Sequence, residues 1–336
     1  MRAETPPTSS QPPVLLSQAG TCVLSVVVPV FNEEAVIDIF HERLSQVLAA
    51  CPGTHEILYV DDGSTDASAT VLERLRTSCP QVGVARLSRN FGKEHAMTAG
   101  LKLARGEAVI ILDVDLQDPP ELIPSMLAAW REGADVVNMR RTGRDGETAF
   151  KIATAHFFYR IINCLSDVSI PSDVGDFRLF SRRAVDALNR LPESNRFMKG
   201  LFAWIGFRQI TLNYHRQSRA AGLSKWPYWK LWNFALEGIT SFSTVPLRIA
   251  SYVGFASALG AFLYALYFLV KTAIWGDSVR GFPTMIEIVL LLGGLQLMAI
   301  GIMGEYVGRM YLESKRRPIY LLDSFQPARL TDPAAL

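Results

Sequence analysis

The sequence predicts an α/β domain with a mostly parallel sheet, followed by two membrane-spanning helices. Before residue 245, short apolar runs alternate with helical patterns, and after it two long segments carry almost no charge. Strands that alternate with helices are typical of a parallel sheet covered by helices on both faces. The 336 residues, 49% of them hydrophobic, suffice for one such domain and an appendage.

The alternation is clearest in the first 112 residues. Strands are expected at 23–30, 56–60, 82–87 and 108–112, and helices at 38–50 and 67–78. Ligands of parallel sheets bind at the carboxyl ends of the strands. Polar motifs follow three of these strands, so we expect the motifs to meet at one edge of the sheet.

Two apolar segments after residue 245 predict a transmembrane hairpin within 246–310. The run 249–270 holds 22 residues without a charge, and 288–304 is similar. About 20 apolar residues span a hydrocarbon core, so we expect helices at about 247–270 and 284–308. Tryptophan, tyrosine and lysine in 224–245 predict an amphipathic helix in the membrane interface.

Basic residues flank both expected spans and predict the topology. Arg248 precedes the first span, and Arg309 and 315–317 follow the second. Basic flanks stay in the cytoplasm, so both termini, the domain at 21–223 and a tail at 311–336 are expected on the cytoplasmic side of the membrane. Residues 1–20 lack an apolar core, so a flexible tail is expected there and no signal peptide.

Composition and motif spacing exclude several other classes. The net charge is +2, whereas a nucleic-acid binder is usually more basic. The four cysteines lack metal-ligand spacing and indicate free thiols. No Gly-x-Gly-x-x-Gly follows the first strand, which argues against a dinucleotide-binding enzyme.

Acidic residues follow the first, second and fourth expected strands. Pro29, Phe31 and Glu33 end the first, and Asp61-Asp62-Gly63 follows the second. Gly63 permits a tight turn, but a turn does not need the two acids, and carboxylates accept hydrogen bonds from ribose and base donors.

After the fourth strand, the sequence reads Asp113-Val114-Asp115-Leu116-Gln117. Two aspartates one residue apart on an extended chain share a face. Hard oxygen ligands of this kind hold Mg²⁺ or Mn²⁺, which also binds phosphate.

Together these motifs resemble the family 2 glycosyltransferases, whose Rossmann-like catalytic domain is called GT-A. Four further runs are similar to the polyprenyl-phosphate glycosyltransferases, which include GtrB-type bactoprenol glucosyltransferases and dolichol-phosphate mannose synthases. They are 88–94, 175–179, 195–200 and 219–225, and the run 304–309 is similar to bacterial two-span members. The resemblance implies an inverting transfer of a hexose, glucose from UDP-glucose by similarity to the GtrB type, onto polyprenyl phosphate.

The resemblance also implies residue roles. The donor nucleotide is expected at Pro29, Phe31, Glu33, Asp61 and Asp62, and the metal at Asp113, Asp115 and Gln117, with Asp115 also catalytic. Basic positions expected around the acceptor phosphate and the diphosphate are Arg140, Arg144, Arg178 and Arg219. Asp176 matches the proposed catalytic acid/base.

Several alternatives stay open. A phosphate monoester has a second pKa near 6, so Asp176 is either a base or an orienting group. Mannose, N-acetylhexosamine or aminoarabinose could replace glucose on the same lipid. A glycan-extending family 2 synthase is the competing activity, although its usual Gln-x-x-Arg-Trp motif is absent: Gln217 is followed by Ser218-Arg219. A non-catalytic scaffold would not need intact acids at three strand ends.

Glycines in the second span predict helix contacts and a homo-oligomer.

Overall fold

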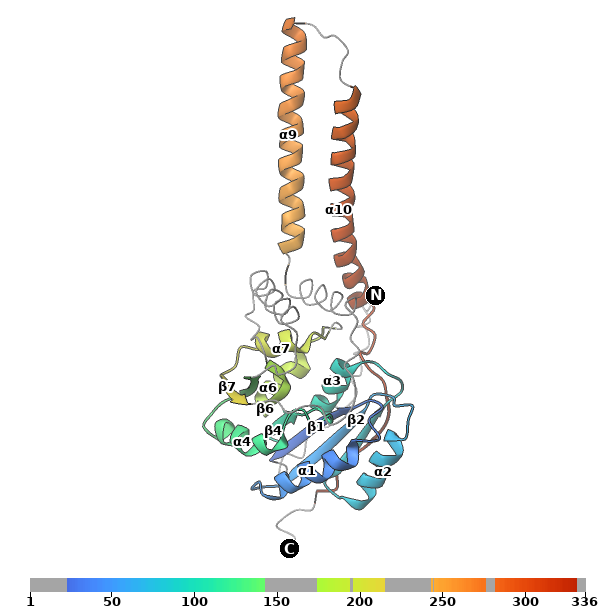
Figure 1. Cartoon of the computed structure of the whole chain (residues 1–336), viewed down its shortest axis with the longest axis vertical. Helices are drawn as coiled ribbons and strands as arrows, with labels where there is room; N and C mark the ends of the chain where they lie inside the picture. The colour runs from blue at the N-terminus through green and yellow to red at the C-terminus, as the bar shows by residue number, and fades with distance from the viewer. Residues whose placement is uncertain are drawn as a thin grey trace, which may run out of the picture.

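The computed structural model describes residues 23–142, 174–193, 196–214, 243, 245–275 and 282–330 (Figure 1). Within them, the strands are β1 (Leu24–Val30), β2 (His55–Asp61), β3 (Val82–Leu87), β4 (Ala108–Ile111), β5 (Val136–Arg141), β6 (Val174–Ser181), β7 (Gln209–Tyr214) and β8 (Leu322–Gln326). The helices are α1 (Ile37–Ala49), α2 (Ser68–Ser78), α3 (Lys93–Leu103), η1 (Pro120–Leu122), α4 (Ile123–Arg131), α6 (Arg182–Arg190), α7 (Met198–Trp204), α9 (Val245–Trp275) and α10 (Phe282–Ser314).

The strands form one sheet in the order β7-β5-β6-β4-β1-β2-β3-β8. Strands β4, β1, β2 and β3 are parallel neighbours, as the sequence predicts, whereas β6 runs antiparallel to both β4 and β5. The sheet is therefore mixed and mostly parallel, which confirms the predicted fold class.

Helices cover both faces of the sheet. Val26 and Val28 of β1 point to the face packed by α1, α2 and α4, and Val27 points to the face packed by α3, α6 and α7. This alternation follows from the two-residue period of a strand. Helix α3 lies very close to β1. A Cβ atom on Gly100 would stand only 2.2 Å from Val27 Cγ1. Glycine at this position therefore sets how closely α3 packs against the sheet.

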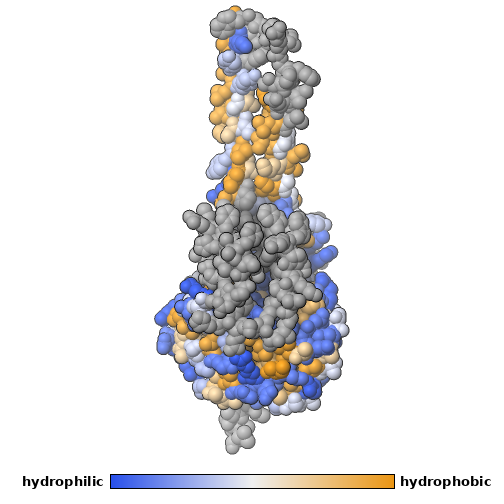
Figure 2. Space-filling view, viewed as in Figure 1, coloured by the Kyte–Doolittle hydropathy of each residue, from blue (hydrophilic) through white to orange (hydrophobic). Residues whose placement is uncertain are grey.

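Helices α9 and α10 lie side by side and project away from the sheet domain (Figure 1). Both are long and apolar enough to cross a membrane by length and composition. Large apolar side chains such as Phe255, Tyr252 and Leu297 are exposed on them, and the space-filling view shows this hydrophobic surface (Figure 2). The expected spans 247–270 and 284–308 fall inside these two helices. Unburied apolar surface of this extent indicates a lipid environment.

The chain after α10 returns to the sheet domain. We call residues 318–330 the C-terminal strap. Its strand β8 pairs antiparallel with β3, and Ser88 N donates to Leu321 O at 2.9 Å. Farther along, Arg329 N donates to Pro80 O at 2.7 Å. We expected only a tail at 311–336, so this strand is a structural feature without a sequence signal.

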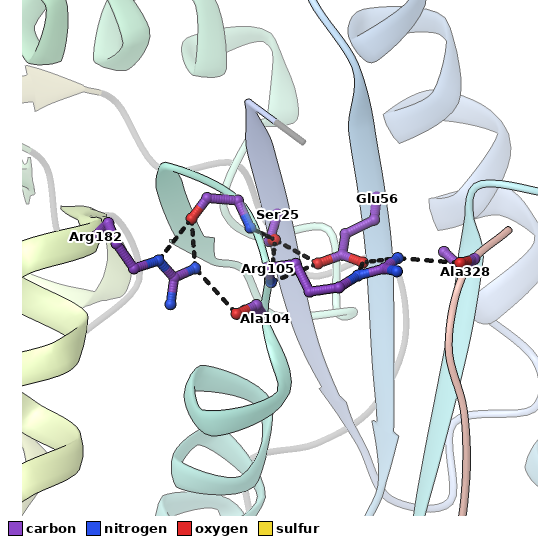
Figure 3. Close-up of polar contacts among 7 residues, drawn as sticks. Ser25, Glu56, Ala104, Arg105, Arg182 and Ala328 are labelled. Carbon is purple, nitrogen blue, oxygen red and sulfur yellow. Dashed lines mark hydrogen bonds and ion pairs between the residues drawn. The ribbon is translucent and has the colours of Figure 1, made fainter. Parts of the chain in front are cut away.

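A buried carboxylate links the strap to the amino ends of β1 and β2 (Figure 3). Glu56, 4% exposed, accepts from Ser25 Oγ at 2.6 Å and from Arg105 Nε and Nη2 at 2.9 and 2.6 Å. Arg105 Nη2 also donates to the carbonyl of Ala328 in the strap at 3.0 Å. Nearby, the Arg182 guanidinium donates to two backbone carbonyls in the loop before β4. This network lies at the edge opposite the predicted site.

Two expected segments cannot be compared with the structure. The N-terminal tail at 1–20 lies outside the described residues, and so does the interfacial helix at 224–245, apart from Ser243 and Val245.

Candidate active site

The three acidic motifs meet at the carboxyl ends of β1, β2 and β4. Val30 of β1 pairs with Asp61 of β2, and β4 on the other side of β1 leads into Asp113. Of the residues predicted to contact a nucleotide, Pro29 in β1 is buried, whereas Phe31, directly after β1, is 42% exposed. Glu33 follows in the next loop and is partly buried.

Hydrogen bonds tie the loops after β1 and β2 together. Asn32 has a left-handed φ of 55°, its backbone N–H donates to Ser64 Oγ at 3.0 Å, and its side-chain Oδ1 accepts from Thr65 N at 2.8 Å. At Gly63, with φ of 69°, a Cβ atom would stand 2.5 Å from the carbonyl carbon of Arg89. The turn at Gly63 therefore has room for no side chain, which fixes the shape of this side of the site.

Asp61 and Asp62 are both buried, but their partners differ. Asp61 Oδ1 accepts from Ser64 N at 2.9 Å, and its Oδ2 lies 3.5 Å from Arg86 Nε. Asp62 accepts from two backbone N–H groups of the loop 88–92, at 2.8 and 2.9 Å. Burial raises the pKa of Asp62, and these two bonds offset part of the rise. Asp62 therefore anchors this loop, so its expected contact with a nucleotide stays a prediction.

The loop after β4 contains the predicted metal ligands. Leu116 has a left-handed φ of 60°, and Gln117 N donates to Asp115 Oδ1 at 3.1 Å. Gln117 is 7% exposed, and its Oε1 accepts no hydrogen bond from the part of the chain that the structure describes. A buried oxygen that accepts no hydrogen bond is uncommon, and such an oxygen can bind a cation.

These oxygens fit a divalent cation that arrives with a phosphate ligand. Asp115 is partly exposed, and with Gln117 Oε1 it offers the hard oxygen donors that Mg²⁺ and Mn²⁺ prefer. Among the described residues, no three His, Cys, Asp or Glu side chains gather into a metal cage. Diphosphate oxygens would therefore have to complete the coordination.

Lys93, the first residue of α3, lies between two of the predicted site residues. Its Nζ is 2.7 Å from the carboxylate of Asp113 and 2.6 Å from Asp176 Oδ2. The side chain of Lys93 is 41% exposed, whereas those of Asp113 and Asp176 are 24% and 16% exposed. One ammonium thus joins the β4 loop to β6. Lys93 belongs to the run 88–94, but no role was predicted for it from the sequence.

The surroundings of Asp176 keep it ionised. Burial raises the pKa of Asp176, but the ammonium groups of Lys93 and Lys199 outweigh this effect and hold the pKa well below its usual range. Next to it, burial and the charge of Asp176 raise the pKa of Glu94 to about 8. The neutral form of Glu94 is therefore favoured beside the charged Asp176.

The basic residues predicted to bind phosphate have different positions. Arg178 is 1% exposed, its Nε donates to Gly175 O at 3.1 Å, and its guanidinium lies 4.8 Å from the ring centre of Phe202. This position holds β6 against α7. Arg140 is exposed at the end of β5. Arg144 and Arg219 lie outside the described residues.

A buried aspartate with two partners supports the loop after β4. Asp118, 1% exposed, accepts a hydrogen bond from the Tyr214 hydroxyl and lies 3.6 Å from Arg141 Nη2. These residues come from three separate elements, so no local pattern could have predicted the contact. A site role for Lys93 was easier to predict than the Asp118 contact. A lysine at the start of a helix, after a loop at a strand end, faces the same edge of the sheet as the acids.

Comparison with known proteins gives the family. The glycosyl transferase family 2 pattern matches residues 25–188, and the GtrB C-terminal hairpin pattern matches residues 245–310. The bactoprenol glucosyl transferase of Shigella phage SfX is 47% identical over 301 residues, which cover 90% of this chain and 99% of that protein. The prophage bactoprenol glucosyl transferase homolog of Escherichia coli K12 is 46% identical over 299 residues, 89% and 98% of the two chains.

Among solved structures, glucosyl-3-phosphoglycerate synthase from Mycobacterium tuberculosis, in complex with Mn²⁺, UDP-glucose and phosphoglyceric acid, superposes with a TM-score of 0.43 at 20% identity. The superposition covers 69% of this chain and 84% of that one. The matches to the two sequence relatives cover nearly the whole length of each relative, so they are the stronger finding. The chain belongs to glycosyl transferase family 2, and it is an enzyme of this family that carries a GtrB-type hairpin at 245–310.

Proposed function

We propose that the protein transfers glucose from UDP-glucose to the phosphate of a polyprenyl lipid such as undecaprenyl phosphate. The observation that carries the proposal is the 47% identity to a bactoprenol glucosyl transferase over 99% of that protein. The acidic strand ends and the apolar hairpin support it, because one chain then has a donor site and a means of reaching a membrane lipid.

The proposed donor site lies on the β1, β2 and β4 ends. The exposed ring of Phe31 offers a face for the base, and Asp61 and Glu33 offer oxygens to the nucleoside. Asp113, Asp115 and Gln117 would hold Mg²⁺ or Mn²⁺ against the diphosphate. When bound, the cation neutralises the charge that develops on the departing nucleoside diphosphate.

In the proposed reaction, a phosphate oxygen of the lipid attacks C1 of the sugar in line with the leaving group. The new bond joins C1 to the lipid phosphate, the bond from C1 to the UDP oxygen breaks, and the configuration at C1 inverts. The acceptor is mostly a dianion near neutral pH, so no proton has to be removed. The lowered pKa of Asp176 makes it a weak base, which favours an orienting role.

We further propose that the catalytic domain lies on the cytoplasmic side of the bacterial inner membrane. The start of α9 and the end of α10 both lie at the end of the hairpin that is nearer the sheet domain (Figure 1), and Arg248, Arg309 and residues 315–317 provide the basic flanks. In a cysteine-free background, an impermeant thiol reagent added outside the cell should label Asp277→Cys and miss Ser10→Cys. The reverse labelling would refute this orientation. A homo-oligomer through the hairpin stays a prediction.

A screen of nucleotide-sugars tests the activity. Purified protein in lipid nanodiscs is given undecaprenyl phosphate, Mn²⁺ and one donor at a time, and the lipids are analysed by mass spectrometry. We expect a single hexose on the lipid phosphate with UDP-glucose. A longer glycan would favour the glycan-extending alternative, and another sugar on the same lipid would replace glucose in the proposal.

A further inference from the structure

Lys93 joins the donor half of the site to the half that carries Asp176. Its ammonium hydrogen-bonds to Asp113 Oδ2 at 2.7 Å and to Asp176 Oδ2 at 2.6 Å. Asp113 belongs to the loop after β4, and Asp176 belongs to β6. The ammonium therefore stands between the two groups of residues that the two substrates would contact.

Lys93 has the capacity for one more acceptor. An ammonium group carries three N–H donors. One is directed at Asp176 Oδ2 and one at the Asp113 carboxylate, both of whose oxygens lie 2.7 Å from Nζ. The residues that the structure describes give Lys93 no further hydrogen bond. The side chain is 41% exposed, so part of it is open to a ligand.

Charge explains why the acceptor needs a cation here. A phosphate dianion brought next to the ionised Asp176 would be repelled by it. Lys93 touches Asp176 directly, and Lys199 also acts on it electrostatically. Arg178 is buried against Phe202, so among these cations Lys93 combines contact with Asp176 and exposure.

We propose that Lys93 binds the acceptor phosphate through its third N–H and places it between Asp113 and Asp176. The proposal rests on the function proposed above. It assigns the acceptor contact to a lysine at the start of α3. The donor diphosphate is the other phosphate within the site, and the experiment distinguishes the two.

The test compares Lys93→Met, Lys93→Arg and Lys102→Met in the full-length protein. Lys102 is an exposed lysine in the last turn of the same helix, which makes its variant a matched control. Acceptor KM is measured with undecaprenyl phosphate in nanodiscs, and the Kd of UDP-glucose with Mn²⁺ is measured by calorimetry without acceptor. Circular dichroism and melting temperature report folding.

For Lys93→Met we expect acceptor KM to rise roughly ten- to hundredfold, as for a lost charge-assisted hydrogen bond. The Kd of the donor should stay within about twofold or tighten, since Asp113 no longer pairs with an ammonium. Lys93→Arg should recover part of the acceptor affinity, and Lys102→Met should match wild type.

Two results would overturn the proposal. One is an unchanged acceptor KM in Lys93→Met, and the other is a parallel loss of donor binding, which would assign Lys93 to the diphosphate or to the fold. If wild-type protein makes no glycosylated lipid at all, the proposed function fails. If wild-type protein is active and Lys93→Met has the same acceptor KM, only the proposal for Lys93 is refuted.

Discussion

The side chain of Arg105 joins the C-terminal strap to the buried Glu56 of β2. Arg105→Met removes two hydrogen bonds to the buried Glu56 and one to Ala328 O. Breaking a buried ion pair costs about 3–5 kcal/mol. The side chain of Arg105 is 38% exposed, and Glu56 keeps the Ser25 hydroxyl and one backbone N–H, so we expect about 2–3 kcal/mol. For a domain of this size, that loss lowers the melting temperature by about 4–12 °C.

The assay is thermal unfolding of the full-length protein in detergent, with hydrogen exchange of the strap. Arg74→Met is the matched control, because the Arg74–Asp38 ion pair is 61% and 53% exposed and should contribute under about 1 kcal/mol. Arg105→Met/Glu56→Gln should recover part of the loss, since it leaves no unpaired buried charge. A melting temperature of Arg105→Met equal to that of Arg74→Met, with unchanged exchange at 322–328, would refute this account of the strap.

Three further predictions concern the site. Asp115→Asn should fold and insert but lose roughly a hundredfold or more of metal-dependent turnover; near-normal kcat at saturating Mn²⁺ would exclude Asp115 as a ligand. Asp176→Asn should lower turnover by less than roughly a hundredfold and mainly raise acceptor KM, because the charged partner that positions Lys93 is lost. A larger fall in kcat would indicate an obligatory base. Glu94 has a folded-state pKa raised from 4.5 to about 8, so its contribution to stability falls as pH rises through this window. Glu94→Gln should therefore gain melting temperature relative to wild type between about pH 5 and pH 9, and a pH-independent difference would contradict the raised pKa.

Local sequence patterns predicted the first half of the sheet because burial there follows a simple rule. Central parallel strands are buried on both faces, so β1 and β4 appear as continuous apolar runs. The expected strand 82–87 coincides with β3, and the other expected strands and helices differ by one residue at their ends. Such runs need no tertiary information to be found.

Strand β8 could not be predicted in this way. All five of its residues are exposed, and the segment Leu322–Gln326 has no apolar face that would mark a strand. It is held by pairing with the edge of β3 and by the Arg105 contact with Ala328, which come from distant parts of the chain. Tertiary contacts of this kind leave no local periodicity.

The candidate site was predictable in position and less so in detail. The acids at three strand ends meet at one edge of the sheet, as the sequence predicts. The structure adds that Asp62 anchors a loop, that Arg178 is buried, and that Lys93 pairs with Asp113 and Asp176. These details depend on how α3 and α7 pack on the sheet, which the spacing of residues along the chain does not determine.

The most direct test of the central claim follows phosphorus in the reaction. Purified protein is mixed with UDP-glucose, Mn²⁺ and undecaprenyl phosphate in detergent, and ³¹P NMR records the phosphate signals over time. The account predicts that the monoester signal of the lipid is replaced by a diester signal while UDP appears in equal amount, and that Asp115→Asn abolishes both changes. UDP release with an unchanged lipid monoester signal would contradict transfer to the lipid phosphate.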